Sequence, residues 1–304
     1  MRFHVVGLPH TQTNGTHCSC AFTTKTYRFC KMMSRLGHQV FHYGAEGSDL
    51  KDYAEEVTIL SATEQQALCG DNPHNQLYDV DWTGKTPIWP VFNVRAADAI
   101  VARKQAGDFV CVIGGKNNQL LADLVGKDVA VVEFGIGYDG VFAKYRVYDS
   151  YAHMHKILGA EHGYGPDGDF YHVAIPNGFD LSEYPYYDQS QSGNYFLYLG
   201  RLIKRKGIHI AVETCKRLNA KLVIAGAGVK EYNDHRLTAT DGEVYEYENL
   251  EYVGFADQAK RADLLGKAIA TFYPTLYVEP GGYVAVESQL TGTPAITTDW
   301  GFFT

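Results

Sequence analysis

Short β-rich runs alternate with helical patterns along most of this chain, and this alternation restricts its fold more than any other feature. A strand pattern at 3–7 precedes a helical pattern at 19–36, and the same order recurs in the second half at 195–199 and 207–218. Strands that alternate with helices form parallel sheets covered on both faces. The sequence therefore predicts an α/β protein with doubly wound parallel sheets.

The pattern gives two series of elements. In the first half, strands are expected at 3–7, 39–43, 57–60, 109–113, 129–134 and 171–175, and helices at 19–36, 94–105, 117–125 and 141–158. In the second half, strands are expected at 195–199, 221–225, 250–253, 269–273 and 295–298, and helices at 207–218, 257–267 and 282–290. The acid-rich segment 229–251 is expected to be a solvated loop or helix face.

A polar, aperiodic segment separates the two series. It is rich in Pro, Ser, Gln and Gly, which is typical of a linker. We predict a first domain at 1–184, a linker at 185–194 and a second domain at 195–304. A length of 304 residues also favours two domains over one.

Charge and hydropathy narrow the possible partners. Thirty-five acidic residues against twenty-seven basic ones give a net charge of −8, which argues against a chain built to bind nucleic acid or anionic lipid. No apolar run approaches the roughly twenty residues of a transmembrane helix, and Arg2 leads directly into a strand pattern rather than a signal peptide. We expect a cytoplasmic chain without a transmembrane segment.

A basic loop follows the expected strand 195–199. The segment 200–207 has the sequence Gly-Arg-Leu-Ile-Lys-Arg-Lys-Gly, with four cations in six positions of an acidic protein. Ligands of doubly wound sheets bind beyond the carboxyl ends of the strands. Cations beside a helix N-terminus would suit a diphosphate there. The alternative interpretation is a solvated basic turn.

A second loop carries two glutamates eight positions apart, Glu279 and Glu287, with Pro280-Gly281-Gly282 between them. A glycine-rich helix start exposes backbone N–H groups, and carboxylates accept hydrogen bonds from vicinal hydroxyls. This combination suits a sugar and a ribose. For either glutamate alone, the alternative is an acid that stabilises a helix N-terminus.

Four motifs together resemble the retaining glycosyltransferases of family 4. They are Gly-Arg-x4-Lys-Gly at 200–207, Ala-Gly-Ala-Gly at 225–228, Tyr-Val-Gly-Phe at 252–255 and Glu-x7-Glu at 279–287. The resemblance is strong from 175 to 301 and looser before. It implies the GT-B fold, in which two Rossmann-like domains face a cleft.

The resemblance also implies roles for single residues in binding a nucleotide-sugar donor. Arg201 and Lys206, in the loop that begins at Gly200, would contact the diphosphate, and Glu287 would accept from the ribose hydroxyls. Glu279 would lie near the donor sugar, orienting it and stabilising an oxocarbenium-like state.

Backbone groups complete the implied site. The N–H groups of Gly281, Gly282 and Tyr283 would hold sugar hydroxyls or phosphate oxygens, and backbone near Phe255 would face the base. Because cations and helix dipoles stabilise the leaving group in such enzymes, no cofactor and no metal are expected.

The sequence departs from the family in three places. The loop after the first strand, 9–15, has one glycine instead of several. The strand 129–134 carries Glu133 where many members have a histidine, so Glu133 is a candidate catalytic residue, with a carboxylate paired inside the cleft as the alternative. The chain also ends soon after strand 295–298, so the second domain is expected to be incomplete.

The resemblance implies retaining transfer of a hexose from a nucleotide diphosphate sugar to a hydroxyl acceptor, either a saccharide or a lipid-linked glycan. The alternatives are a nucleotide-sugar binding protein with impaired catalysis and, less favoured, a UDP-sugar 2-epimerase. A nicotinamide dehydrogenase is disfavoured because no Gly-x-Gly-x-x-Gly follows the first strand. Two Asp-x-Asp pairs, at 79–81 and 167–169, are not expected to bind a metal.

Overall fold

The computed structural model describes residues 1–17, 19–70, 86–163, 168–188 and 193–304. The chain divides into two compact units. The described residues up to Phe179 form the first, and Asp180–Thr304 form the second. This division lies a few residues before the end of the first domain predicted from the sequence.

The first unit is built on a seven-stranded parallel sheet with the order β3-β2-β1-β4-β5-β6-β7. Its strands are β1 (Arg2–Val6), β2 (Gln39–Ala45), β3 (Glu55–Leu60), β4 (Phe109–Val112), β5 (Ala130–Ile136), β6 (Tyr145–Tyr148) and β7 (His172–Ala174). The strand order reverses between β1 and β4. That reversal is where a doubly wound sheet opens toward a ligand.

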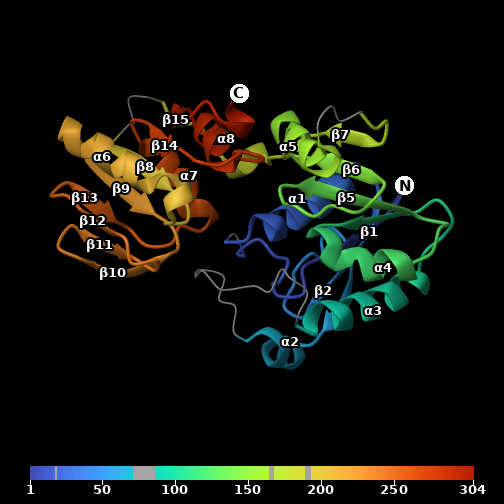
Figure 1. Ribbon diagram of the computed structural model, residues 1–304. Coiled ribbons are helices and arrows are strands. Elements are labelled where there is room, and N and C mark those ends of the chain that lie inside the picture. The colour runs from blue at the N-terminus through green and yellow to red at the C-terminus, as the bar shows by residue number, and fades with distance from the viewer. Residues whose placement is uncertain (18, 71–85, 164–167, 189–192) are drawn as a thin grey trace. The chain divides into compact units, whose positions relative to one another are not determined.

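Helices connect these strands. They are α1 (Ala21–Arg35), α2 (Ala62–Cys69), α3 (Ile88–Val101), α4 (Gln119–Leu124) and α5 (Tyr151–His162). The connection through α1 leads from β1 to β2, on one side of β1 in the sheet. The connections through α3 and α4 lead to β4 and β5, on the other side of β1. Right-handed crossovers therefore place α1 on the opposite face from α3 and α4, which lie side by side (Figure 1). The core between these layers includes Val5, Phe92 and Val110, none of them exposed.

Three helices of the first unit differ from prediction, and one of them, α2, was not expected from the sequence. The expected helix 141–158 is wrong in its first part, where Tyr145–Tyr148 forms β6. Aromatic and β-branched residues favour a strand there, and α5 begins only after Ser150, whose side chain accepts from the His153 N–H at 3.3 Å. Helix α3 begins at Ile88 rather than at 94. Pro90 is tolerated because it lies in the first turn, where its N–H would have no partner in the helix.

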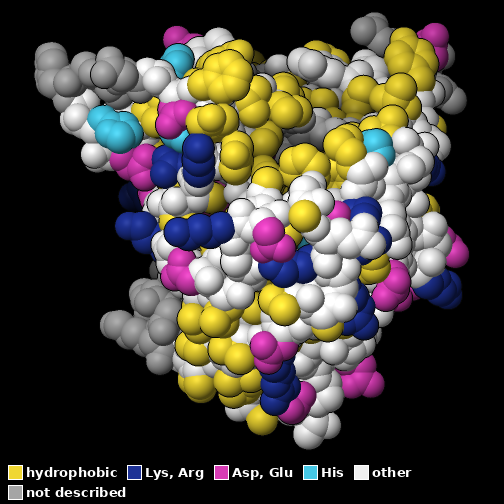
Figure 2. Space-filling model, turned by 90° about the vertical axis from the view of Figure 1, so that its right-hand side faces the viewer, with side chains coloured by type: hydrophobic (Ala, Val, Ile, Leu, Met, Phe, Trp, Pro, Cys, Tyr) yellow, Lys and Arg dark blue, Asp and Glu magenta, His cyan; other side chains and the backbone are white. Residues whose placement is uncertain are grey.

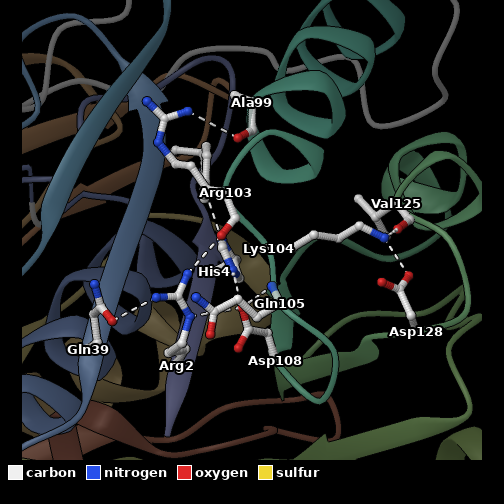
Figure 3. Close-up of polar contacts among 11 residues, drawn as sticks. Arg2, His4, Gln39, Ala99, Arg103, Lys104, Gln105, Asp108, Val125 and Asp128 are labelled. Atoms are coloured by element: carbon white, nitrogen blue, oxygen red, sulfur yellow. Dashed lines mark hydrogen bonds and ion pairs between the residues drawn. The ribbon is translucent and has the colours of Figure 1, made fainter.

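A buried polar network joins the amino ends of β1 and β4 (Figure 3). His4 Nε2 lies 3.0 Å from Asp108 Oδ2, and His4 Nδ1 lies 2.8 Å from the Tyr43 hydroxyl. Arg2 Nε donates to the same Asp108 oxygen at 3.1 Å. Burial lowers the pKa of His4 despite the neighbouring carboxylate. Because this network lies at the amino edge of the sheet, we interpret it as structural.

The second unit contains a five-stranded parallel sheet with the order β13-β9-β8-β14-β15. Its strands are β8 (Tyr195–Leu199), β9 (Lys221–Ala225), β13 (Leu250–Tyr252), β14 (Thr271–Tyr273) and β15 (Ala295–Thr297), and its helices are α6 (Ile208–Leu218), α7 (Gln258–Lys267) and α8 (Tyr283–Leu290). The sequence predicted each of these elements to within a few residues. The fold class, α/β with two doubly wound parallel sheets, is confirmed.

One connection of the second unit is not a loop or a helix. Between β9 and β13 the chain forms a three-stranded antiparallel sheet of β10 (Val229–Asn233), β11 (Arg236–Ala239) and β12 (Val244–Glu246). The expectation of a solvated loop or helix face at 229–251 is therefore wrong. Leu237 and Ala239 are fully buried against the α6 side of the sheet, so the small sheet covers the face that a crossover helix would cover.

Both signs of charge occur on the face shown in Figure 2, where lysine and arginine side chains lie among aspartate and glutamate side chains. Among the described residues, every helix is too short or too polar to cross a bilayer.

Candidate donor-binding site

The two loops that carry the sequence motifs follow neighbouring strands, β8 and β14. Gly207 ends the first loop with φ +76°, and a Cβ built on it would lie 1.9 Å from the Pro274 carbonyl oxygen, directly after β14. Only glycine fits this close backbone contact. Leu276 N also donates to Arg205 O at 2.8 Å. The basic loop is thus packed on the loop that leads to Glu279.

Lys206 and Glu279 form a buried ion pair at the centre of these loops. Lys206 Nζ lies 2.9 Å from Glu279 Oε2 and 2.9 Å from the Tyr273 hydroxyl, and it also contacts the Tyr277 hydroxyl. Lys206 is 9% exposed and Glu279 6%. The structure therefore brings together two residues that the sequence assigned to one site.

The pKa of Glu279 reflects opposing effects. Burial acts to raise it, but the Lys206 charge and hydrogen bonds from Tyr277, Lys206 and the Gly282 N–H outweigh burial and hold the pKa below its usual value. Glu279 is thus a carboxylate that carries a negative charge next to the Lys206 ammonium group.

Arg201 follows β8 directly and is exposed. Burial lowers the pKa of Lys206, the neighbouring Glu279 opposes that shift, and the Arg201 charge adds to it. Leu202 N donates to Ala227 O at 2.9 Å, which joins the basic loop to the loop after β9. Gly200 lies in this contact as well, because a Cβ on Gly226, which has φ +147°, would be 1.9 Å from the Gly200 carbonyl oxygen.

Glu287 lies on α8 and is 2% exposed. The Tyr184 hydroxyl donates to its Oε1 at 2.8 Å, and Arg261 NH2 on α7 contacts its Oε2. Both carboxylate oxygens therefore already accept hydrogen bonds within the second unit. Glu287 therefore ties α8 to α7 and to the segment that carries Tyr184.

The start of α8 contains the three residues whose backbone N–H groups were expected to bind a ligand, and one of these N–H groups already has a partner. Gly282 is the N-cap residue, Tyr283 is the first residue of the helix, and Gly281 is buried just before it. Gly282 directs its N–H to the Glu279 carboxylate. This carboxylate and the helix N-terminus stabilise each other.

Phe255 lies after β13, and its side chain is half-buried. The neighbouring Gly254 carbonyl accepts from Gly226 N at 3.1 Å, and the Tyr252 hydroxyl donates to Gly226 O at 2.9 Å. The loops after β8, β9, β13 and β14 thus form one connected edge of the second sheet.

Glu133 belongs to the first unit and has a different environment. It is fully buried in β5; its Oε2 accepts from the N–H groups of Phe142 and Ala143 at 2.8 Å each, and its Oε1 accepts from the Tyr138 hydroxyl at 3.2 Å. Burial raises its pKa although these hydrogen bonds oppose the shift. The geometry matches the alternative of a paired carboxylate more closely than that of a catalytic group.

Sequence reasoning missed four side chains of the second unit. Tyr273 and Tyr277 contact Lys206, whereas Tyr184 and Arg261 contact Glu287. Tyrosine is abundant in this chain, with 22 residues, so type alone gave no signal. The proximity of Tyr277 to Glu279 in the sequence was the one available indication.

No group of three or more His, Cys, Asp or Glu side chains that could hold a metal occurs within the described ranges. The Asp-x-Asp pair at 79–81 lies outside those ranges, and Asp167 of the second pair does as well.

Comparison with known proteins places this site in a recognised domain. Residues 187–304 match the family model described as Glycosyl transferases group 1. Glycogen synthase of Mycobacterium tuberculosis is 33% identical over 143 residues, which are 42% of this chain and 32% of that protein. An uncharacterized glycosyltransferase of Methanocaldococcus jannaschii is 31% identical over 110 residues, 34% of this chain and 27% of that protein. The chain thus spans about a third of the length of these relatives.

Solved structures resemble the whole chain. The glycosyltransferase AviGT4, involved in avilamycin A biosynthesis, aligns with a TM-score of 0.65 and 18% identity over 99% of this chain and 80% of its own. Sucrose-phosphate synthase of Thermosynechococcus elongatus aligns with a TM-score of 0.68 and 15% identity over 99% and 82%. HepE of Anabaena, solved with UDP and glucose, aligns with a TM-score of 0.60 and 13% identity over 99% and 81%. Residues 187–304 are therefore similar to the glycosyl transferases of group 1, and the fold is that of the GT-B glycosyltransferases.

Proposed function

We propose that the chain is a retaining glycosyltransferase of family 4 that transfers a hexose from a nucleotide diphosphate sugar to a hydroxyl acceptor. The observation that carries this proposal is the buried Lys206–Glu279 pair, which joins the Gly-Arg-x4-Lys-Gly and Glu-x7-Glu motifs at the carboxyl ends of β8 and β14. The group 1 family match over the same residues supports it.

In this proposal Arg201 and Lys206 face the diphosphate, and Glu279 faces the hexose. The bond between the anomeric carbon and the diphosphate oxygen breaks, a bond to the acceptor oxygen forms on the same face, and the acceptor proton leaves with the diphosphate. The cations stabilise the charge that develops on the departing diphosphate, and single groups of this kind contribute about 3 kcal/mol. Glu279 orients the sugar and stabilises positive charge on its ring.

The base of the donor would lie against backbone near Phe255, and Glu287 would accept from the ribose. UDP and glucose in the HepE structure support a UDP-linked hexose as the first donor to test. The acceptor is a saccharide or a lipid-linked glycan, and the reaction is proposed to take place in the cytoplasm.

Thermal unfolding with UDP-, GDP-, ADP- and TDP-linked sugars tests donor binding. A donor at about 100 times its dissociation constant adds roughly 2.7 kcal/mol to the free energy of unfolding, so the midpoint should rise by a few degrees with at least one donor. Arg201→Ala should abolish the rise. Arg217→Ala is the matched control, because Arg217 is an exposed arginine of the same unit that pairs with Glu213 on α6.

Release of nucleoside diphosphate with the donor found in this way separates the candidate activities. Release that depends on an added acceptor supports transfer. Binding without release supports a nucleotide-sugar binding protein, and conversion of the donor sugar without an acceptor supports the epimerase. The absence of a shift with all four donors would contradict the proposed site.

A further inference from the structure

Tyr277 contacts three charged groups of the donor site. It lies on the loop between β14 and α8, and its side chain is half-buried. Its hydroxyl contacts Lys206 Nζ and Glu279 Oε2, and its ring lies beneath the Arg205 guanidinium. Neither the family match nor the sequence motifs assign a role to Tyr277 or to Arg205.

The hydroxyl of Tyr277 bridges the ion pair. An ammonium group has three N–H donors, and those of Lys206 reach Tyr273, Tyr277 and Glu279. Since Lys206 can only donate, the Tyr277 oxygen accepts from it and the Tyr277 O–H donates to Glu279. The hydroxyl therefore fixes the cation and the carboxylate relative to each other.

The ring of Tyr277 holds a second cation. Arg205 Cζ lies 5.1 Å from the ring centroid, within the range of a cation–π contact. The backbone of Arg205 is fixed by the Leu276 N–H, 2.8 Å from its carbonyl oxygen. Arg205 is exposed, and its side chain forms no ion pair with a carboxylate of the described residues. Its guanidinium is thus held in place with donors available to a ligand.

The charge of the site leaves a role for this guanidinium. Glu279 offsets part of the Lys206 charge, so a further cation would help to balance the additional charge of a departing diphosphate. A stacked guanidinium can donate two parallel hydrogen bonds to phosphate oxygens. Arg205 is a cation of the basic loop whose orientation is fixed by an aromatic ring.

We infer that Arg205 is a further diphosphate-binding residue of the donor site and that Tyr277 is the positioning residue that holds it through its ring and holds Lys206 through its hydroxyl. This inference rests on the proposed function, because it assigns both residues to the leaving group of a nucleotide-sugar donor.

A double-mutant cycle tests the inference. The probe is the nucleoside diphosphate of the best donor, and its affinity is measured by titration calorimetry for wild type, Arg205→Ala, Tyr277→Leu and the double variant. Arg205→Ala should weaken binding about tenfold, and Tyr277→Leu should do so at least as much. The double variant should bind no more weakly than Tyr277→Leu, since Arg205 contributes only while it is stacked.

Two further variants separate the ring from the hydroxyl. Tyr277→Phe keeps the ring, so Arg205→Ala should still weaken binding about tenfold in that background, while kcat with the full donor falls because Lys206 and Glu279 lose their bridge. Tyr273→Phe is the matched control: it removes another hydroxyl that contacts Lys206 and should leave the effect of Arg205→Ala unchanged.

Lys204→Ala controls for charge, because Lys204 is an exposed cation one position from Arg205. It should change the affinity less than twofold. An equal loss in Lys204→Ala and Arg205→Ala would overturn the inference, as would an equal effect of Arg205→Ala with and without the Tyr277 ring. If Tyr277→Leu does not fold, Arg205→Lys is tested in its place. Arg205→Lys keeps the positive charge but loses the planar guanidinium that stacks on the Tyr277 ring. Wild-type affinity in Arg205→Lys would also overturn the inference. Failure of wild type to bind any nucleoside diphosphate would instead refute the proposed function.

Discussion

At the scale of single residues, the Lys206–Glu279 pair has an energetic cost that its neighbours offset. Removing two charges from water is unfavourable, and the pair is retained only because further hydrogen bonds satisfy both groups. Tyr273 and Tyr277 supply those hydrogen bonds to Lys206. A structural pair could be replaced by apolar residues, so its presence at the carboxyl edge of the sheet points to a role in ligand binding.

Glu279→Gln should lower the free energy of unfolding by about 3 kcal/mol, because it leaves a buried ammonium without a counter-charge. Urea unfolding followed by circular dichroism measures the change. Glu213→Gln is the control, since it removes one member of an exposed pair in the same unit and should cost less than about 1 kcal/mol. Equal effects of the two variants would show that the pair is not buried as described.

The residues of the site were only partly predictable. Arg201, Lys206, Glu279 and Glu287 stand in motifs with fixed spacing, so the sequence singled them out as candidates, and the structure pairs Lys206 with Glu279. Tyr184 and Arg261 reach Glu287 from distant segments, and no local pattern encodes contacts across about 26 to 103 positions. Glu133 was a candidate because it stands where many members of the resembled family have a histidine, yet its hydrogen bonds to backbone became visible only in the structure.

At the scale of elements, the departure that matters most is the small sheet β10–β12. Residues 229–251 are acidic and polar, which favours a solvated loop, but alternate positions on β11 are apolar and buried. Leu237 and Ala239 pack with Tyr245 into the core beneath α6. Apolar residues alternate with polar ones over only a few positions of this segment, and the many charges around them hide the pattern. The sequence alone therefore did not predict the small sheet.

Leu237→Ala should destabilise the second unit by about 2 to 5 kcal/mol, because it opens a cavity at a fully buried position. Val244→Ala on the neighbouring strand removes a side chain that is 44% exposed and should change stability by about 0.5 kcal/mol or less. Thermal unfolding of both variants measures the difference. Similar midpoints would indicate that the small sheet does not cover the core.

At the scale of the whole molecule, buried histidines should make the stability of the first unit depend on pH. Burial lowers the pKa of His10 and of His42 to about 3 and that of His153 to about 4. The Lys156 charge acts on His153 in the same direction as burial, whereas the Tyr138 carbonyl opposes it. These imidazoles are neutral in the folded unit and become protonated on unfolding below pH 6.5.

Stability of the first unit should therefore be fully present above pH 6.5 and fall as the pH drops toward 4, because the unfolded chain binds more protons. Each histidine contributes a slope of about 1.4 kcal/mol per pH unit. Trp89 is buried in this unit, so its fluorescence in a Trp82→Phe, Trp300→Phe background reports urea unfolding there. His42→Asn should make the pH dependence of the unfolding free energy less steep by the contribution of one histidine. An unfolding free energy that is the same at pH 7.5 and pH 5 would contradict the assignment of neutral, buried histidines.

The proposed chemistry also predicts how the enzyme responds to metal removal. In the proposed mechanism, Arg201, Arg205 and Lys206 supply the positive charge that a divalent ion supplies in other enzymes. Transfer from the best donor should keep its rate in excess EDTA. A loss of rate that added Mg²⁺ or Mn²⁺ restores would contradict metal-independent transfer.

The fold at this scale was predictable because regular alternation of strands and helices leaves few alternatives. Both parallel sheets and most crossover helices follow from hydrophobic periodicity. The sequence did not show β6, whose four residues were absorbed into the helical pattern that follows them.

The central claim is that a nucleotide-sugar donor binds at the carboxyl edge of the second sheet. Hydrogen–deuterium exchange with and without the best donor locates the site directly. Peptides that cover 200–207 and 274–287 should gain protection, while the amino-edge network around His4 and Asp108 should exchange as before. Protection confined to other peptides, with these two segments unchanged, would contradict the account.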